Sequence, residues 1–368
     1  MTCAALAAAA LALAPAGEIA LPPVWRGEAT RGLSGLARAA GDAYYAVRDG
    51  GGWLYALEIG VDRATGQPTN AVFTGRVRLA GRDDLECVRW DAARRQVWVG
   101  DERDGSLRAF DPATGEEAAR VDVPAVFDAF RFNRSFESLA LSPDGRALWT
   151  CNEEALCRCE AVGREARGAA RVRPETPDVD DGPRATRARG TRVRLQRFVR
   201  ASAAAPWRAA GQWLYETDGV GGRDFLGKAR CGVSDLLCLD DGTLLALERE
   251  MSVKKGALLP SFRCRVYALD FAEAEDVSDV LSLRETTRRP VRKRRLFGAN
   301  TGFAMYEGIA QGPTLADGAR SVLLVSDGGD GAANRILALR AEFPGGFGEA
   351  VLSRPVPNPH QSPRASPR

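Results

Sequence analysis

Histidine is almost absent from this sequence: among its 368 residues the only one is His360. The residues around His360 are rich in Pro, Ser and Arg and show no apolar periodicity, which predicts a disordered tail over residues 346–368. A Ser-His-Asp or Cys-His hydrolase, a His-ligated zinc site and a phosphohistidine intermediate all need an ordered imidazole. We therefore expect none of these mechanisms.

A bias in net charge is also missing, because 51 Lys and Arg residues oppose 48 Asp and Glu residues and leave a net charge of +3. Proteins that bind nucleic acids usually gather a clear excess of basic residues. We therefore expect no nucleic-acid partner for this chain.

No apolar stretch is long enough to span a bilayer, so no transmembrane segment is expected. The small-apolar run over residues 1–16 ends in Ala14-Pro15-Ala16, which fits the small-x-small rule for cleavage. This pattern predicts a signal or targeting peptide over residues 1–16 and a secreted or exported protein, periplasmic or extracellular. Because no Lys or Arg precedes the run, an Ala-rich organellar transit peptide and a plain disordered terminus are the alternatives.

Short alternating apolar runs, separated by Gly, Asp and Pro, fill the chain from about residue 25 onward and predict β-strands. The stretch from Glu137 to Glu154 shows the unit: an apolar run, the turn Ser142-Pro143-Asp144-Gly145, a second apolar run and a closing pair of acids. Similar units recur about every 50 residues, a period typical of propeller blades. The sequence thus predicts an all-β fold, a single β-propeller.

Five such units can be read, and a sixth blade stays open because about two periods separate the third unit from the fourth. Residues 161–192, inside that gap, have almost no apolar pattern and are predicted to form a disordered insertion. The propeller would cover residues 17–345. Residues 18–26 would add an N-terminal strand to the last blade and close the ring, which removes exposed sheet edges.

Acidic residues recur at matching positions of these units. The start of each first strand, which lines the channel of a propeller, carries Ser34, Glu86, Glu137, Asp235 or Glu307. Further acids lie near the ends of the second strands: Asp49, Asp101, Glu102, Glu153, Glu154, Glu248, Glu250 and Asp327.

Like charges that converge in a narrow channel repel one another unless some are protonated or a cation lies among them. Oxygen ligands without His or thiolate favour a hard cation, and Ca²⁺ tolerates irregular carboxylate geometry better than Mg²⁺. The acids therefore point to a Ca²⁺ site or a substrate site at one mouth of the channel. The alternative is that they cap turns and accept hydrogen bonds from backbone N–H groups.

Three motifs follow one another along the chain. The first joins Asn133-x-x-Phe136-Glu137-Ser138-Leu139-Ala140 to Ser142-Pro143-Asp144-Gly145. The second joins Ser234-Asp235-Leu236-Leu237 to Asp241-Gly242-x-Leu244-Leu245-x-Leu247-Glu248-Arg249. The third joins Tyr306-Glu307-Gly308-Ile309-Ala310 to Leu323-Leu324-Val325-Ser326-Asp327. In this order they resemble the phytase-like domain family, also described by the words "esterase-like activity of phytase", over roughly residues 30–341.

The resemblance implies a β-propeller that is often exported, a hydrolase activity, and similarity to calcium-dependent propeller phytases. Carried over residue by residue, it points to Glu137, Asp235, Glu248, Arg249, Glu307 and Asp327. The sequence departs from the family pattern at Cys87 and Ser138, where Gly usually follows the acid. It departs again at Gly328-Gly329, where polar residues commonly follow the Asp.

Together these observations predict a Ca²⁺-dependent hydrolase, a monomer, that acts on small-molecule phosphate or other esters at the acidic channel mouth. The residues expected to be catalytic are Glu137, Asp235, Arg249 and Glu307. The expected metal ligands are Glu86, Glu137, Asp235, Glu248, Glu307 and Asp327. Arg249 or Lys228 would neutralise negative charge that develops on the substrate. A non-catalytic exported propeller that serves as a binding scaffold is the alternative, and a sugar-lactone hydrolase is a further one.

Overall fold

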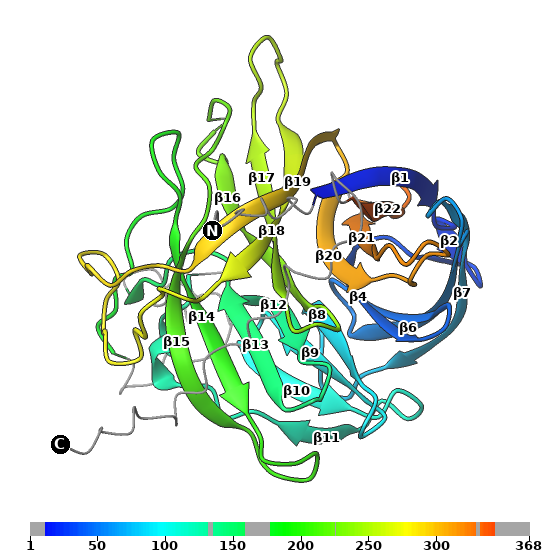
Figure 1. Cartoon of the computed structure of the whole chain (residues 1–368), viewed down its shortest axis with the longest axis horizontal. Helices are drawn as coiled ribbons and strands as arrows, with labels where there is room; N and C mark the ends of the chain where they lie inside the picture. The colour runs from blue at the N-terminus through cyan, green and yellow to red at the C-terminus, as the bar shows by residue number, and fades with distance from the viewer. Residues whose placement is uncertain (1–11, 132–134, 159–176, 225, 329–331, 343–368) are drawn as a thin grey trace, which may run out of the picture.

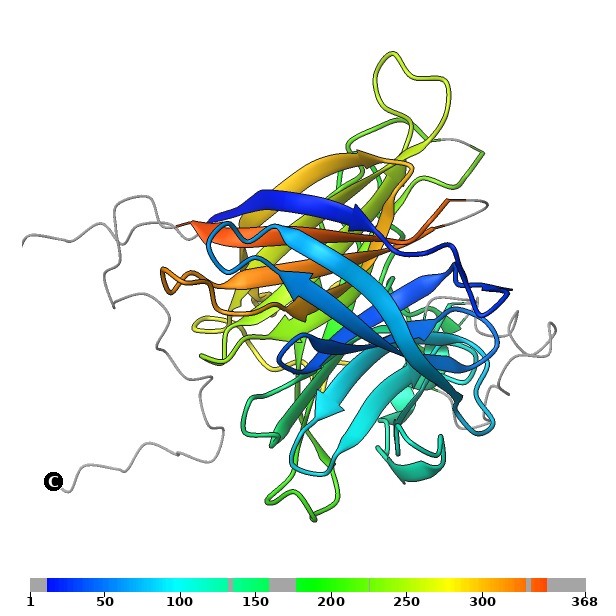
Figure 2. The same ribbon diagram turned by 90° about the vertical axis from the view of Figure 1, so that its right-hand side faces the viewer.

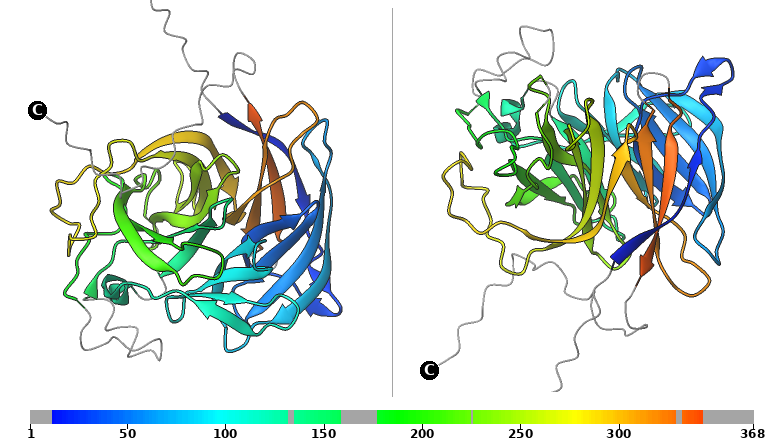
Figure 3. Two further views of the ribbon diagram at one scale, coloured as in Figure 1. Left: turned by 60° about the horizontal axis from the view of Figure 1, so that its bottom comes forward. Right: turned by 90° about the horizontal axis from the view of Figure 1, so that it is seen from above.

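Antiparallel strands that pair with their neighbours in sequence build this protein (Figure 1). The computed structural model describes residues 12–131, 135–158, 177–224, 226–328 and 332–342. Within them, five four-stranded sheets form the blades of a β-propeller, and Figure 3 shows these sheets side by side around a ring. The predicted all-β propeller is therefore confirmed, with five blades.

In four of the blades the strands follow the order of the chain from the channel outward. Blade 1 comprises β4 (Leu33–Ala40), β5 (Ala43–Arg48), β6 (Trp53–Val61) and β7 (Pro68–Arg78). Blade 2 comprises β8 (Leu85–Asp91), β9 (Gln96–Asp101), β10 (Ser106–Phe110) and β11 (Glu117–Arg120). Blade 3 comprises β12 (Phe136–Leu141), β13 (Ala147–Asn152), β14 (Arg192–Val199) and β15 (Arg208–Glu216). Blade 4 comprises β16 (Arg230–Cys238), β17 (Leu244–Ser252), β18 (Ser261–Asp270) and β19 (Arg292–Gly302).

Blade 5 is completed from the other end of the chain. It comprises β20 (Met305–Gln311), β21 (Ser321–Asp327), β22 (Arg335–Glu342) and the N-terminal β1 (Ala12–Ala20). Strand β1 pairs antiparallel with β22 from Ala12↔Glu342 to Ala20↔Arg335, and Figure 2 shows the dark blue strand beside the orange one. Closure by an N-terminal strand is thus confirmed. The small hairpin of β2 (Val24–Trp25) and β3 (Glu28–Ala29) and the short 3-10 helix η1 (Ala125–Ala129) lie outside the blades.

The closing strand starts earlier than the sequence predicts. It begins at Ala12 rather than Glu18, because Leu13 is buried in the same hydrophobic cluster as Leu339 of β22. Residues 12–16 of the predicted targeting peptide therefore belong to blade 5, and cleavage after Ala16 would remove about half of β1. Residues 1–11 and the tail 346–368, with His360, lie outside the described residues.

The predicted insertion between the third and fourth units contains no sixth blade in its described part. Residues 161–176 lie outside the described residues, and residues 177–191 form a loop that leads into β14. This loop is not disordered, because Asp181 is fully buried and forms an ion pair of 2.8 Å with Arg194 of β14. The sequence of this loop is rich in charged residues and has no apolar periodicity, so it does not indicate that Asp181 is buried.

Hydrophobic clusters fill the spaces between neighbouring blades. Trp149 of blade 3 shares a cluster with Leu236 of blade 4, and Leu247 of blade 4 shares the next with Leu324 of blade 5. Equivalent clusters join blades 5 and 1, 1 and 2, and 2 and 3. Each blade is thus held by burial of apolar surface on both of its faces.

Every inner strand carries a β-bulge, near its start in blades 1, 2, 3 and 5 and in the middle of β16 in blade 4. The ladder between the first and second strand skips one residue, which has no partner opposite it. These five residues are Ser34, Glu86, Glu137, Ser234 and Glu307. In blade 4 the bulge falls on Ser234, so Asp235 stands one position later than the acids with which the sequence aligns it.

Neighbouring inner strands approach one another closely at residues that follow the bulges. A Cβ atom on Gly308 would lie 2.9 Å from the Cα of Gly35, and one on Gly35 would lie 2.9 Å from the Cα of Cys87. Such contacts are too short for real Cβ atoms, so the inner strands approach one another more closely than side chains would allow. Asp235 occupies this position in blade 4.

A buried ion pair fills the centre of the ring; we call it the channel hub, Arg89 with Asp235. The Nη2 of Arg89 donates to Asp235 Oδ2 at 2.8 Å, and its Nη1 donates to the carbonyl of Leu36 at 2.8 Å. The Asp235 carboxylate also accepts the backbone N–H groups of Leu139 at 3.3 Å and Ile309 at 2.9 Å. These residues lie on β4, β8, β12, β16 and β20, so the hub joins all five inner strands. Burial raises the pKa of Asp235 to about 6 although Arg89 opposes the rise.

Replacing Arg89 by Met should destabilise the protein strongly, because it leaves the Asp235 carboxylate buried without its cation. Loss of one partner of a buried pair typically costs about 3–5 kcal/mol. Urea unfolding followed by circular dichroism measures this change. The control is Arg63→Met, which breaks an ion pair with Asp42 whose side chains are 43% and 42% exposed and should change stability little. An Arg89→Met protein as stable as the wild type would contradict the role assigned to the hub.

Candidate functional site

Two groups of carboxylates meet at the end of the ring where the inner strands begin. The first carboxylate group is Asp49, Asp84 and Glu86, and the second carboxylate group is Glu102, Glu137 and Glu153. Within each group, one oxygen from every residue lies within 4.8 Å of the others, as a shared cation requires.

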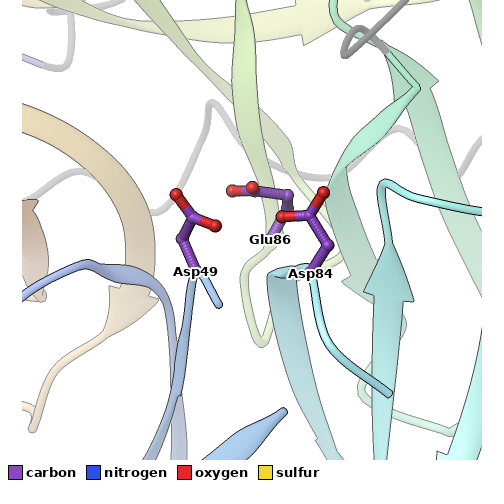
Figure 4. A group of neighbouring side chains, drawn as sticks. All are labelled: Asp49, Asp84 and Glu86. Atoms are coloured by element: carbon purple, nitrogen blue, oxygen red, sulfur yellow. The ribbon is translucent and has the colours of Figure 1, made fainter. Parts of the chain in front are cut away.

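The first carboxylate group spans blades 1 and 2. Asp49 follows the last residue of β5, Asp84 precedes β8, and Glu86 is the bulge residue of β8. Figure 4 shows their carboxylates turned toward one another, with Asp49 on one side and Glu86 and Asp84 on the other. Asp49 is exposed and the other two are partly buried, so a solvated ion can reach the group.

Repulsion and burial make this group costly to ionise. Burial, a hydrogen bond with Asp49 and the charge of Glu102 raise the pKa of Asp84 to about 8. Burial and the charges of Glu102 and Glu137 raise the pKa of Glu86 well above its usual range. Since Glu102 and Glu137 belong to the second carboxylate group, the two groups form one connected field of negative charge.

Backbone and side-chain contacts position the second carboxylate group. Glu137 is the bulge residue of β12, while Glu102 and Glu153 directly follow β9 and β13. The Oε1 of Glu102 accepts the N–H of Ser135 at 3.3 Å, and the hydroxyl of Ser135 donates to the Glu102 carbonyl at 2.9 Å. All three acids are buried.

Arg249 of β17 is the cation that faces these acids. Its Nη2 donates to Glu153 at 2.8 Å and to Glu137 at 3.3 Å, and its Nη1 contacts Glu307, the bulge residue of β20. Gly232, opposite Arg249 in the ladder, allows this approach, because a Cβ atom there would lie 2.7 Å from the Cγ of Glu153. The two carboxylate groups with Arg249 and Glu307 constitute what we call the acidic mouth.

Four of the predicted site residues meet at the acidic mouth: Glu86, Glu137, Arg249 and Glu307. Asp327 ends β21 and lies near Gly32 of blade 1, but it belongs to neither carboxylate group formed by the described residues. Lys228 is exposed in the loop before β16.

The structure does not bring Asp235 and Glu248 to the acidic mouth, so the site must be corrected for both. Asp235 lies in the channel hub, because the bulge of β16 falls one residue earlier. Glu248 precedes Arg249 on a strand, and successive side chains of a strand point to opposite faces. Its carboxylate accepts hydrogen bonds from Tyr215 at 2.6 Å and Lys293 at 2.5 Å, on the outer strands of blades 3 and 4.

Four acids of the site were not predicted as ligands. Asp49, Glu102 and Glu153 stand in the sequence as acids at the ends of second strands, and this shared position was the available signal. Asp84 lies before a first strand, two residues ahead of Glu86, and only the turn of the chain brings it back to Asp49.

A comparison with known protein families identifies the relatives of this chain. The family model described as phytase-like, "Esterase-like activity of phytase", matches residues 28–328. The chain belongs to the phytase-like family. The match includes blades 1 to 4 and the first two strands of blade 5, with every residue of the acidic mouth. The resemblance carried by the three sequence motifs is thereby confirmed.

Other comparisons are less informative about this phytase-like protein. No curated protein matches its sequence significantly. Among solved structures, it is similar to a crystal structure of an ancestral GH74 enzyme with a TM-score of 0.33 and 10% sequence identity. That alignment covers 81% of this chain and 33% of the other, so the chain spans about a third of that protein's length. In the described part of the chain, no helix has the length and apolar character needed to cross a membrane.

The raised pKa of Asp84 predicts a specific pH dependence of the metal-free protein. In the unfolded chain the pKa of this carboxyl is about 4. The pKa of Asp84 is higher in the folded protein than in the unfolded chain, so the protonated carboxyl favours the folded state. This contribution to stability is complete below about pH 4 and is lost as the pH rises through about 8. In the presence of a chelator, Asp84→Asn should therefore flatten the fall of the melting temperature between about pH 5 and 8.5.

The matched control for this measurement is Asp83→Asn. Asp83 is the exposed neighbour of Asp84 and pairs with the exposed Arg103. This variant removes the same charge from the same loop and should keep the wild-type slope in differential scanning calorimetry. Equal slopes for Asp84→Asn and the wild type would refute the assignment.

Proposed function

We propose that this phytase-like protein is a Ca²⁺-dependent hydrolase of small-molecule esters, phosphate esters first, and that its reaction takes place at the acidic mouth. The observation that carries the proposal is the pair of adjoining carboxylate groups next to one arginine. The family match supports a propeller of hydrolase type. The ion and the substrate are inferred from the chemistry of the side chains.

The donor set of the first carboxylate group fits a hard divalent cation. All its ligand atoms are carboxylate oxygens, and the pKa of Asp84 and that of Glu86 are raised by burial and by the neighbouring acids. A cation would relieve this repulsion and allow both carboxyls to ionise. Irregular multi-carboxylate sites suit Ca²⁺ better than Mg²⁺, which demands near-octahedral geometry. Asp49, Asp84 and Glu86 would hold the ion.

A bound Ca²⁺ supplies Lewis-acid polarisation of an ester oxygen and lowers the pKa of water. Arg249 supplies fixed positive charge that binds a phosphate oxygen and stabilises negative charge during the reaction. Glu137 and Glu153 hold its guanidinium, and Glu307 holds it from blade 5, so the cation is oriented before substrate arrives. Glu137 contacts Arg249 and neighbours the first carboxylate group, a position from which a carboxylate accepts a proton from water.

Two of the departures from the family pattern, Cys87 and Ser138, do not touch this machinery. Cys87 is fully buried in the cluster between blades 2 and 3. The hydroxyl of Ser138 donates to the carbonyl of Cys151 at 3.0 Å and accepts its N–H at 2.9 Å, so it serves the ladder of blade 3. Both residues follow a bulge, and neither belongs to the carboxylate groups of the acidic mouth. These two departures therefore leave the residues of the acidic mouth unchanged.

Removal of the cation should abolish turnover. Hydrolysis of p-nitrophenyl phosphate and p-nitrophenyl acetate is measured before chelation, after chelation and after addition of Ca²⁺. The proposal expects loss of activity with chelator and recovery with Ca²⁺. Turnover that persists in chelator would sink it. Ca²⁺ binding in calorimetry without turnover of any ester would favour the binding scaffold instead.

Replacing Arg249 by Met should lower kcat roughly 100-fold, the usual effect of removing one group that stabilises developing charge. Arg249→Lys should recover part of the activity on the phosphate ester because it retains the charge. The matched control is Arg263→Met on the neighbouring strand β18, whose side chain pairs with Glu250 outside the acidic mouth. Equal kcat for Arg249→Met and this control would contradict the role of Arg249.

A further inference from the structure

Blade 4 extends farther than its neighbours at the end of the ring that carries the acidic mouth. The hairpin that joins β17 to β18 projects from the molecule, at the top of Figures 1 and 2. The loop before β16 accompanies it, because Arg223 and Val253 form a β-bridge and the Arg223 side chain donates to the Ala257 carbonyl at 3.3 Å. We call residues 221–224, 226–229, 253–260 and 302–304 the blade-4 projection.

Large apolar side chains are exposed on the blade-4 projection. Leu258 is 88% exposed and Leu259 is 60% exposed at the tip of the hairpin, and Leu226 is 79% exposed in the accompanying loop. Phe303 is 75% exposed and follows Gly302, which pairs with Phe262 at the base of the same hairpin. Four of the seven exposed large hydrophobic residues in the described part of the chain thus lie on one small element. Such clustering marks an interaction surface, whereas single exposed leucines are ordinary.

Basic residues surround these apolar side chains. Lys254 and Lys255 precede the two leucines, and Arg223 and Lys228 flank Leu226. Residues 251–264 contain no acid, and in the described part of the accompanying loop the acid is Asp224. The blade-4 projection therefore carries positive charge, in contrast to the acidic mouth beside it. A convex apolar tip framed by lysines is suited to a negatively charged, deformable layer, since lysine stems can lie along apolar surface while their ammonium groups reach the headgroups.

We propose that the blade-4 projection binds the surface of an anionic lipid bilayer by inserting Leu258, Leu259, Leu226 and Phe303 among the lipids. Lys254, Lys255 and Lys228 bind the negatively charged headgroups at the same time. Insertion buries apolar side chains that water surrounds in the free protein. The interaction needs no hydrolase activity and no cation at the acidic mouth.

Co-sedimentation with vesicles tests this proposal on the full chain. Vesicles of 70% phosphatidylcholine and 30% phosphatidylglycerol should pellet the wild type at low salt, and pure phosphatidylcholine vesicles should pellet much less. The double variant Leu258→Ser and Leu259→Ser should bind at least about tenfold more weakly, because two large apolar side chains no longer enter the bilayer. Lys254→Gln with Lys255→Gln should weaken binding roughly tenfold and reduce its dependence on salt.

The matched control is Leu281→Ser, which removes another leucine, 55% exposed, from the loop between β18 and β19. It should bind the vesicles like the wild type, and all variants should share the wild-type melting temperature because the changed side chains are exposed or, for Lys254, only partly buried. Absence of wild-type binding to the anionic vesicles would overturn the proposal. It would also be overturned if Leu258→Ser with Leu259→Ser bound like Leu281→Ser, or if ultracentrifugation showed that the leucines hold two copies of the chain together.

Discussion

The contact between Arg89 and Asp235 fixes the geometry on which the rest of the protein depends. Both side chains are buried. The guanidinium donates hydrogen bonds and the carboxylate accepts them, and together these bonds join all five inner strands. Apolar clusters hold neighbouring blades together in pairs, but they have no direction and set no common centre. The channel hub supplies that centre. Because a buried charge without its partner is unfavourable, the pair favours the one arrangement in which five strands reach it together.

The bulges of the inner strands place acidic side chains together at one end of the ring. At each inner strand one residue leaves the ladder, and in blades 2, 3 and 5 that residue is Glu86, Glu137 or Glu307. The acids thus gather at the acidic mouth, while Asp235, which follows the bulge of blade 4, lies in the channel hub. Their mutual repulsion is opposed by Arg249 and is reflected in the raised pKa of Asp84 and that of Glu86. A divalent cation is the partner that this arrangement of oxygens accommodates best.

Much of this could be predicted from the sequence, because blade repeats leave a period and a turn pattern that do not depend on contacts distant in the chain. The five blades, the N-terminal closing strand and the recurring acids Glu86, Glu137 and Glu307 followed from that pattern. Asp235 and Glu248 did not, because a shift of one residue at a bulge or along a strand reverses where a side chain points. Asp235 and Ser234 are both polar and adjacent, so the sequence offers no sign of which one leaves the ladder. Asp84 could not be predicted as a ligand from the sequence, because its nearness to Asp49 depends on the packing of two blades.

The central claim is that Asp49, Asp84 and Glu86 form a cation site at the acidic mouth. A crystal structure of the protein grown with Ca²⁺, with anomalous scattering recorded at long wavelength, tests it most directly. The account predicts an anomalous peak at about 2.3–2.6 Å from oxygens of these three residues, the range of Ca²⁺–oxygen distances in proteins. A map with no peak at the acidic mouth at saturating Ca²⁺, or with its peak beside Glu248, would contradict it.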